Sequence, residues 1–129
     1  MSPTYTRALV VDDDPILLQV LTAFLARQGV AVLTAHNGAA ATALLSEHDD
    51  IDLIITDLHM PDSNGIEFIE HLNESASRIP LLIISSADKT AITSAEELAK
   101  AHQLNYLGAA PKPINFNALA KMLGLVERA

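Results

Sequence analysis

Four short apolar segments of the chain each end in residues that can bind a cation or a phosphoryl group. The groups are acids, hydroxyls and one lysine: Asp12, Asp13, Asp14, Asp57, Ser85, Ser86 and Lys112. If the four segments are parallel strands of one sheet, their carboxyl ends lie side by side, where open α/β sheets bind ligands. Such a set of side chains suits the binding of a divalent cation beside a phosphoryl group.

The acids have unequal expected roles. Asp14 precedes Pro15, and this pair is typical of a helix N-cap followed by the first helical position. Asp12 and Asp13 have no such structural role, and their charges repel unless a cation compensates them. We therefore expect them to bind a hard cation such as Mg²⁺, which takes few carboxylates and keeps several waters. Asp57 would complete a three-carboxylate cluster, and an aspartate can also attack phosphorus to form an acyl phosphate.

The elements that position these residues alternate between strand and helix. Buried strands are expected at 7–12, 30–35, 52–57, from Pro80 onward and at about 105–110. Helices are expected from Asp14 to Gly29, from Asn37 to about His48, around 66–72, at 90–103 and at roughly 114–127. In the first of these helices, the spacing predicts an inward face of Leu17, Val20, Leu21, Phe24 and Leu25. Five strands alternating with five helices predict an α/β fold with a parallel sheet covered on both faces.

Composition limits the class of protein. A chain of 129 residues, half of them hydrophobic, fits one domain spanning 1–129, and its lack of cysteine excludes disulfides and thiolate metal sites. The net charge of −8 disfavours nucleic acid and anionic membranes as partners, leaving proteins and cations. No apolar stretch approaches the roughly 20 residues of a membrane span, and the N-terminal residues lack the apolar core of a signal peptide. We therefore expect a cytoplasmic protein with no membrane partner.

The combined motif resembles the receiver domain of bacterial two-component response regulators. It consists of Val11 to Pro15, then Asp57 to Pro61 with Gly65, then Ser85, and finally Lys112 with Pro113, and the resemblance covers about residues 7–127. It implies the doubly wound, flavodoxin-like (βα)5 fold of chemotaxis regulators, with strand order 2-1-3-4-5. It also implies a signalling protein that is not a true enzyme, although it could catalyse its own phosphorylation and slow dephosphorylation.

The resemblance implies a role for each residue of the motif. Asp57 would accept a phosphoryl group from a sensor histidine kinase or a histidine phosphotransfer protein, and the modified chain would switch an output domain or target protein. Asp13, Asp57 and the backbone carbonyl of His59 would ligate Mg²⁺, with Asp12 acting through metal-bound water. Ser85 rather than Ser86 would bind one phosphoryl oxygen, because it falls five residues after Pro80. Lys112 would pair with a second phosphoryl oxygen. The peptide bond between Lys112 and Pro113 would be cis.

The sequence departs from the family pattern at the fifth strand. The family often carries an aromatic residue three positions before the lysine, where this chain has Ala109, and Tyr106 lies three residues earlier still. Another segment, such as 86–100, would then have to carry the signal. Pro111 lacks a backbone donor, which fits the edge position that the fifth strand has in this strand order.

Two other functions are considered. A phosphatase of the haloacid-dehalogenase type would use the Asp-x-Asp that begins at Asp12, with Asp12 as nucleophile, but it needs a longer chain and leaves Asp57 unexplained. A receiver-shaped interaction module that is never phosphorylated would not need all of the phosphorylation positions, yet every one is filled. Turnover of p-nitrophenyl phosphate and the effect of phosphorylation on partner affinity would distinguish the three.

Overall fold

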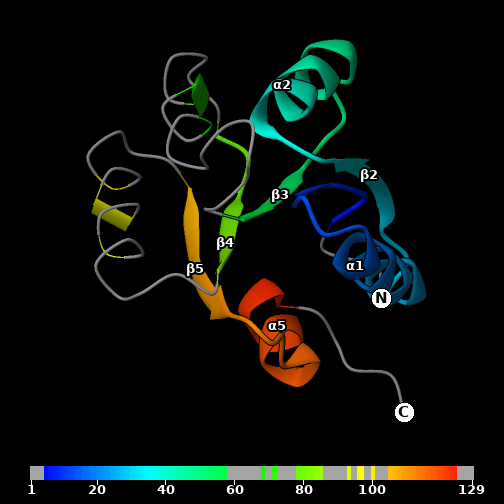
Figure 1. The fold of residues 1–129 in the computed structure, drawn as a ribbon, viewed down its shortest axis with the longest axis vertical. Coiled ribbons are helices and arrows are strands. Elements are labelled where there is room, and N and C mark those ends of the chain that lie inside the picture. The colour runs from blue at the N-terminus through cyan, green and yellow to red at the C-terminus, as the bar shows by residue number, and fades with distance from the viewer. Residues whose placement is uncertain are drawn as a thin grey trace.

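Five parallel strands in the order β2-β1-β3-β4-β5 form the single sheet of the computed structural model (Figure 1). The structure describes residues 5–57, 68, 71–72, 78–85, 93, 96–97, 100 and 105–124. The strands are β1 (Arg7–Val11), β2 (Ala31–Ala35), β3 (Leu53–Asp57), β4 (Leu81–Ser85) and β5 (Tyr106–Pro111). The fold class and strand order expected from the sequence are thus confirmed, and the strand bounds differ from the expected ones by about one residue.

The two strands β3 and β4 are buried along their whole length. Seven of their ten residues are Leu or Ile, because a strand covered on both faces has no polar side to present to water, and the polar residues stand at the carboxyl ends. The edge strands are less buried: β2 exposes Ala31 and Thr34, and β5 ends in the exposed Pro111. Strand β5 lies at the edge of the sheet, as expected from Pro111. Proline has no N–H group, and at an edge this removes no hydrogen bond between central strands.

Helix α1 (Pro15–Arg27) begins and ends as its sequence predicts. The Asp14 carboxylate accepts hydrogen bonds from the backbone N–H groups of Ile16 and Leu17, and Gly29 follows the helix with a φ of 83°. The predicted inward face is partly wrong. Leu18 is buried with Leu21 and Leu25, whereas Val20 is 43% exposed. Apolar residues lie on more than one face of this helix. The face with Leu18, Leu21 and Leu25 is the one that packs against the sheet and is buried.

Two further helices flank the sheet. Helix α2 (Gly38–Glu47) begins where it is expected and is capped by Asn37, and helix α5 (Phe116–Leu123) is capped by Asn115. The expected end of the last helix near 127 is wrong, because Gly124 takes up the left-handed conformation and closes the helix after Leu123. Phe68, His71 and Leu72 are helical, but most of the helices expected around 66–72 and 90–103 lies outside the described residues.

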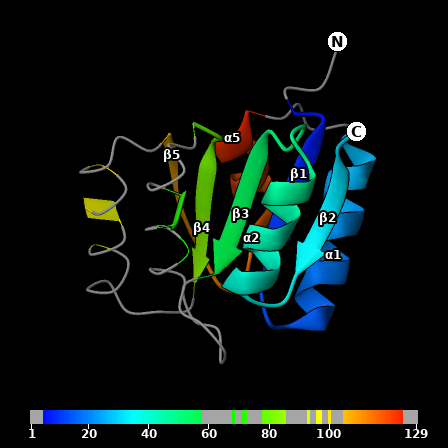
Figure 2. The same cartoon turned by 90° about the horizontal axis from the view of Figure 1, so that it is seen from above.

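The sheet separates two apolar clusters. One contains buried leucines of α1 and α5, and the other contains Ala41 of α2 together with Phe68 and Leu72. Figure 2 shows α2 on one side of the sheet, with α1 and α5 on the other. Alternate residues of each strand enter opposite clusters, for example Leu9 and Val10 of β1. No helix within the described part of the chain is long and apolar enough to span a membrane.

The edge strand β5 contains an irregularity near its start. Its pairing with β4 runs from Leu81 opposite Tyr106 directly to Leu82 opposite Gly108, so Leu107 is an extra residue. Gly108 has a φ of 140°, and a Cβ atom there would lie 2.7 Å from the Met122 side chain of α5. A side chain at this position would thus be strained by the backbone conformation, and the end of the flexible Met122 side chain would have to move.

Candidate functional site

The predicted site residues lie at one edge of the sheet because parallel strands end together. Asp12 directly follows β1 and donates its backbone N–H to Ala35, the last residue of β2. Asp57 is the last residue of β3 and is paired with Ile84 of β4, next to Ser85. Lys112 follows β5 and donates its backbone N–H to the Ser85 carbonyl over 3.1 Å. Four separate segments therefore contribute to one site, as the sequence predicts.

The three carboxylates of Asp12, Asp13 and Asp57 form a cluster. One oxygen from each lies within 4.8 Å of the others. Asp12 is fully buried and Asp57 is 3% exposed, whereas Asp13 is exposed to solvent. Two buried carboxylates and one exposed carboxylate in contact range form an acidic pocket that opens to water on the Asp13 side.

Lys112 is the cation of this pocket. Its Nζ lies 2.8 Å from Asp12 Oδ2 and 3.3 Å from Asp57 Oδ2, so one ammonium bridges both buried acids. Burial alone would lower the pKa of Lys112, but the two neighbouring carboxylates outweigh burial and the pKa is raised. The Lys112–Pro113 bond is cis, as expected. Sequence reasoning assigned Lys112 only to a phosphoryl oxygen and missed these ion pairs, because they depend on tertiary placement.

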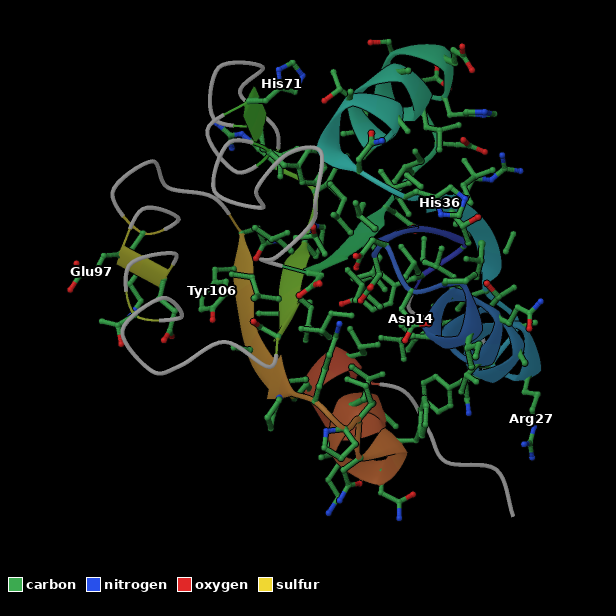
Figure 3. The ribbon with its side chains drawn as sticks, in the orientation of Figure 1. Asp14, Arg27, His36, His71, Glu97 and Tyr106 are labelled. Carbon is green, nitrogen blue, oxygen red and sulfur yellow. The ribbon has the colours of Figure 1, made fainter. Side chains whose placement is uncertain are left out.

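Asp12 is held in place by the start of α1. Its Oδ1 accepts a hydrogen bond from the backbone N–H of Asp14 over 2.9 Å, while the Asp14 side chain caps the helix. Figure 3 shows Asp14 beside α1. Burial is the main reason why the pKa of Asp12 is raised, and the negative charge of Asp57 adds to it. The contacts with Lys112 and Asp14 lower the pKa but do not cancel these effects. The ionised form of Asp12 is therefore less favourable than that of a free aspartate, and a further cation would stabilise it.

The remaining predicted residues are only partly described. Ser85 is buried at 2% exposure and ends β4 beside Asp57, which places it where the sequence predicts. His59 and Ser86 lie outside the described residues. Sequence reasoning also missed a groove beside the site, because it assigned Val20 to the inward face of the helix and did not consider Ile16, which lies one helical turn before Val20.

The residues present fit a divalent cation. Asp12 Oδ2 is buried, and the Lys112 ammonium 2.8 Å from it is shared with Asp57, so that two buried carboxylates rely on one cation. Buried carboxylates without enough positive charge are costly, and a second cation beside them would relieve that cost. The oxygens of Asp12, Asp13 and Asp57 are hard ligands of the kind that Mg²⁺ prefers. The donor set therefore supports the expected cation.

Known proteins resemble this chain in sequence and in fold. Two-component response regulator ORR23 of Oryza sativa subsp. indica is 37% identical over 89 residues, which cover 68% of this chain and 13% of that protein. DNA-binding transcriptional regulator NtrC of Azospirillum brasilense is 36% identical over 121 residues, covering 94% of this chain and 23% of that protein. The chain thus spans less than a quarter of these relatives. The structure of chemotaxis response regulator CheY4 of Vibrio cholerae has a TM-score of 0.78 at 28% identity, covering 94% of this chain and 98% of that one.

The match to a family extends over nearly the whole chain. Residues 8–124 fit the sequence profile described as "Response regulator receiver domain". These residues include all four segments that form the acidic pocket and the Lys112 contacts. With the strand order and the pocket in agreement, the chain belongs to the receiver domain family of two-component response regulators.

Proposed function

We propose that Asp57 is the phosphoryl acceptor of this receiver domain. The observation that carries the proposal is the position of Asp57: it is buried at the end of β3, 3.3 Å from the Lys112 ammonium and within the carboxylate cluster. An oxygen of Asp57 attacks the phosphorus atom of a phosphohistidine, the phosphorus–nitrogen bond breaks, and the imidazole nitrogen keeps the electron pair. The product on this chain is an acyl phosphate.

The neighbouring side chains have separate roles in the proposal. Lys112 moves from its carboxylate contacts to a phosphoryl oxygen, and the Ser85 hydroxyl donates to another. Asp12, Asp13 and Asp57 would hold Mg²⁺, and the His59 carbonyl would be a further ligand. Bound Mg²⁺ neutralises the repulsion between the carboxylates and the incoming phosphoryl group. Such a site could also catalyse phosphorylation from small phosphodonors and slow hydrolysis of the acyl phosphate.

The proposed partners follow from the family. A sensor histidine kinase or a histidine phosphotransfer protein supplies the phosphoryl group. The relatives include DNA-binding and transcriptional regulatory proteins, so an output domain or target protein is the proposed recipient of the signal. We propose that the chain forms one receiver domain with its core at about 7–127, similar to chemotaxis regulators, and that it acts in the cytoplasm of a bacterium.

A groove beside the pocket suits the phosphodonor. It has a volume of about 560 Å³ and is lined by α1 and the segment after β5, including Asp14, which caps α1, and Lys112 of the acidic pocket. Ile16 and Val20, which are 70% and 43% exposed, lie on its α1 side. Exposed apolar side chains one helical turn apart fit the apolar face of a partner helix. A donor helix seated here would bring its histidine to the entrance of the pocket.

Substitution Ile16→Glu is expected to weaken phosphotransfer from a phosphorylated histidine donor. Placing a charge in an apolar contact costs about 1.4 kcal/mol or more, which corresponds to a roughly tenfold higher KM for the donor. Labelling by acetyl phosphate should not change, because this small donor needs no groove. The control is Gln19→Glu, which adds the same charge to an exposed position of α1 outside the groove. Equal effects of the two variants would contradict the groove assignment.

The experiment that tests the phosphoacceptor proposal is labelling with radioactive acetyl phosphate. With Mg²⁺ present, the protein should gain close to one phosphate per chain, and hydroxylamine should release it as expected for an acyl phosphate. Removal of the metal with EDTA should suppress labelling, because the three carboxylates then repel the phosphoryl group. A protein that gains no hydroxylamine-labile phosphate would refute the proposal.

A further inference from the structure

A second cavity, here called the distal cavity, lies at the end of the sheet opposite to the acidic pocket. It has a volume of about 280 Å³ and is lined by the end of α2, by the segments that lead into β3 and β4, and by His71. Figure 3 shows His71 on the side of the sheet where α2 lies. The acidic pocket is formed where the strands end, and its three carboxylates do not line the distal cavity. The proposed phosphorylation chemistry therefore leaves this cavity without a role.

Part of the lining is apolar and belongs to the core. All four apolar side chains of the lining lie in or pack against the cluster on the α2 side of the sheet: Leu45, Ile51, Leu72 and Ile79. Two of them, Ile51 and Leu72, are buried. A surface built on core residues keeps its shape, because their positions are fixed by packing. The distal cavity thus offers a preformed apolar surface to a small molecule.

The polar part of the lining contains an imidazole that is held in one orientation. The Arg7 guanidinium lies 3.4 Å from Nδ1 of His48, and Nε of Arg7 lies 3.2 Å from a carboxylate oxygen of Asp50. A guanidinium can only donate hydrogen bonds, so Nδ1 of His48 accepts and the ring hydrogen is on Nε2. His48 therefore lines the distal cavity as a neutral side chain that has one N–H group to donate.

The charges around the distal cavity favour an anion. Arg78 lines it, is exposed, and has no ion pair within the described part of the chain. Two nearby acids are already engaged, because Asp50 pairs with Arg7 and Asp52 accepts a hydrogen bond from the Arg7 backbone N–H. Among the described lining residues, Asp49 is the one acid. A guanidinium and two imidazoles thus face a single carboxylate.

We propose that the distal cavity binds a small organic anion. One carboxylate of the ligand pairs with Arg78 and accepts the His48 Nε2–H, while an apolar part contacts the leucine and isoleucine side chains. A guanidinium suits this role because it binds a carboxylate through two parallel hydrogen bonds. The volume is at the lower end of the range for small-molecule pockets, about 300–1,000 Å³, and suits a molecule of the size of benzoate. The charge of Asp49 favours a ligand with one acidic group over a ligand with several.

Benzoate is the probe for this proposal, titrated into the whole chain in a buffer without Mg²⁺. The NMR signals of the histidine rings report binding, and the variants His48→Gln and His71→Gln assign them. The signals of His48 and His71 should shift to saturation with a Kd of about 1 mM, whereas His36, which lines a different cavity beside α1, should not respond. Benzyl alcohol lacks the charge and acetate lacks the ring, so each should bind at least about tenfold more weakly.

Two substitutions should change the affinity for benzoate in opposite directions. Arg78→Gln removes the paired charge and should raise the Kd about tenfold, whereas Asp49→Asn removes a like charge and should lower the Kd about two- to threefold. Both positions are exposed, so both variants should keep the fold, which urea unfolding checks. The control is Arg27→Gln, which removes an exposed arginine of α1 on the other side of the sheet and should leave the Kd unchanged.

Three outcomes would overturn the proposal. One is the absence of saturable shifts at His48 and His71 up to about 50 mM benzoate, far above the expected Kd. Another is an equal loss of affinity in Arg78→Gln and Arg27→Gln, which would reveal a dependence on net charge instead of a site. The third is binding of benzyl alcohol as tight as that of benzoate. Labelling of Asp57 by acetyl phosphate is measured separately, so the failure of either proposal is distinguishable from that of the other.

Discussion

Asp57→Asn is expected to abolish labelling by acetyl phosphate, whereas wild type is modified close to stoichiometrically. The amide keeps the size of the carboxylate but lacks the charged oxygen that attacks phosphorus. The fold should survive, because the substitution also removes one of two buried negative charges that share Lys112. A loss of more than a hundredfold in labelling rate, at unchanged circular dichroism and unfolding midpoint, is the expected result. Radioactive incorporation in the presence of Mg²⁺ measures it.

The same assay separates Asp57 from Asp12 as nucleophile. A phosphatase of the haloacid-dehalogenase type would turn over p-nitrophenyl phosphate, lose that activity in Asp12→Asn and keep it in Asp57→Asn. We expect no such turnover. In Asp12→Asn, labelling should need a higher Mg²⁺ concentration, and Asp57 should still be the labelled residue. Asp49→Asn is the control for loss of a surface acid, because Asp49 is exposed. Label retained in Asp57→Asn would contradict the assignment.

The central strands β1, β3 and β4 could be predicted from the sequence because they are short runs rich in Leu, Ile and Val. Such runs are buried in any fold of this class, so that their burial does not depend on details of side-chain packing. The packed stripe of α1 could not be predicted in the same way. Ile16, Leu17 and Val20 are as apolar as Leu18, and the contact with the sheet decides which of them is buried. The face of α1 that does not pack against the sheet, with Ile16 and Val20, lines the groove beside the pocket.

The sequence predicted that the candidate residues lie together, but it did not predict their contacts. Strand ends meet in a parallel sheet, so the acids, Ser85 and Lys112 had to converge. The bridging of two carboxylates by Lys112 depends on the path of the chain after β5, which no local pattern encodes. The bulge at Leu107 is a further example: Gly108 allows it, but the displaced pairing with β4 and the contact with Met122 are tertiary.

Lys112→Met is expected to damage both phosphorylation and stability. The substitution leaves the aliphatic part of the side chain and removes the ammonium that contacts Asp12 and Asp57. Loss of one positioned cation on the phosphoryl oxygens corresponds to a roughly hundredfold slower labelling rate. Two buried carboxylates without their shared cation should lower the free energy of unfolding by about 2–4 kcal/mol in the absence of metal. Labelling kinetics and urea unfolding measure the two effects.

The control for Lys112→Met is Lys121→Met, at an exposed position of α5. It should change the free energy of unfolding by only a few tenths of a kcal/mol, because exposed charges contribute little. Mg²⁺ should stabilise Lys112→Met more than wild type, since the cation binds the folded acids and replaces the missing charge. A stability loss that Mg²⁺ does not reduce would show that Lys112 stabilises the fold by packing rather than by its charge.

The pH dependence of the stability loss distinguishes charge from packing in a second way. Burial holds the pKa of Asp12 above its ordinary value, and Lys112 lowers it, so the Lys112→Met substitution should raise this pKa further. Between the ordinary and the raised pKa, the folded state binds a proton that the unfolded state does not. The free energy of unfolding of Lys112→Met therefore increases as pH falls through the raised pKa. The difference in free energy of unfolding between wild type and Lys112→Met should become smaller as the pH is lowered from 7 towards about 4, the ordinary pKa of an Asp side chain. In Asp12→Asn/Lys112→Met this pH dependence should largely disappear, because the group that takes up the proton is gone.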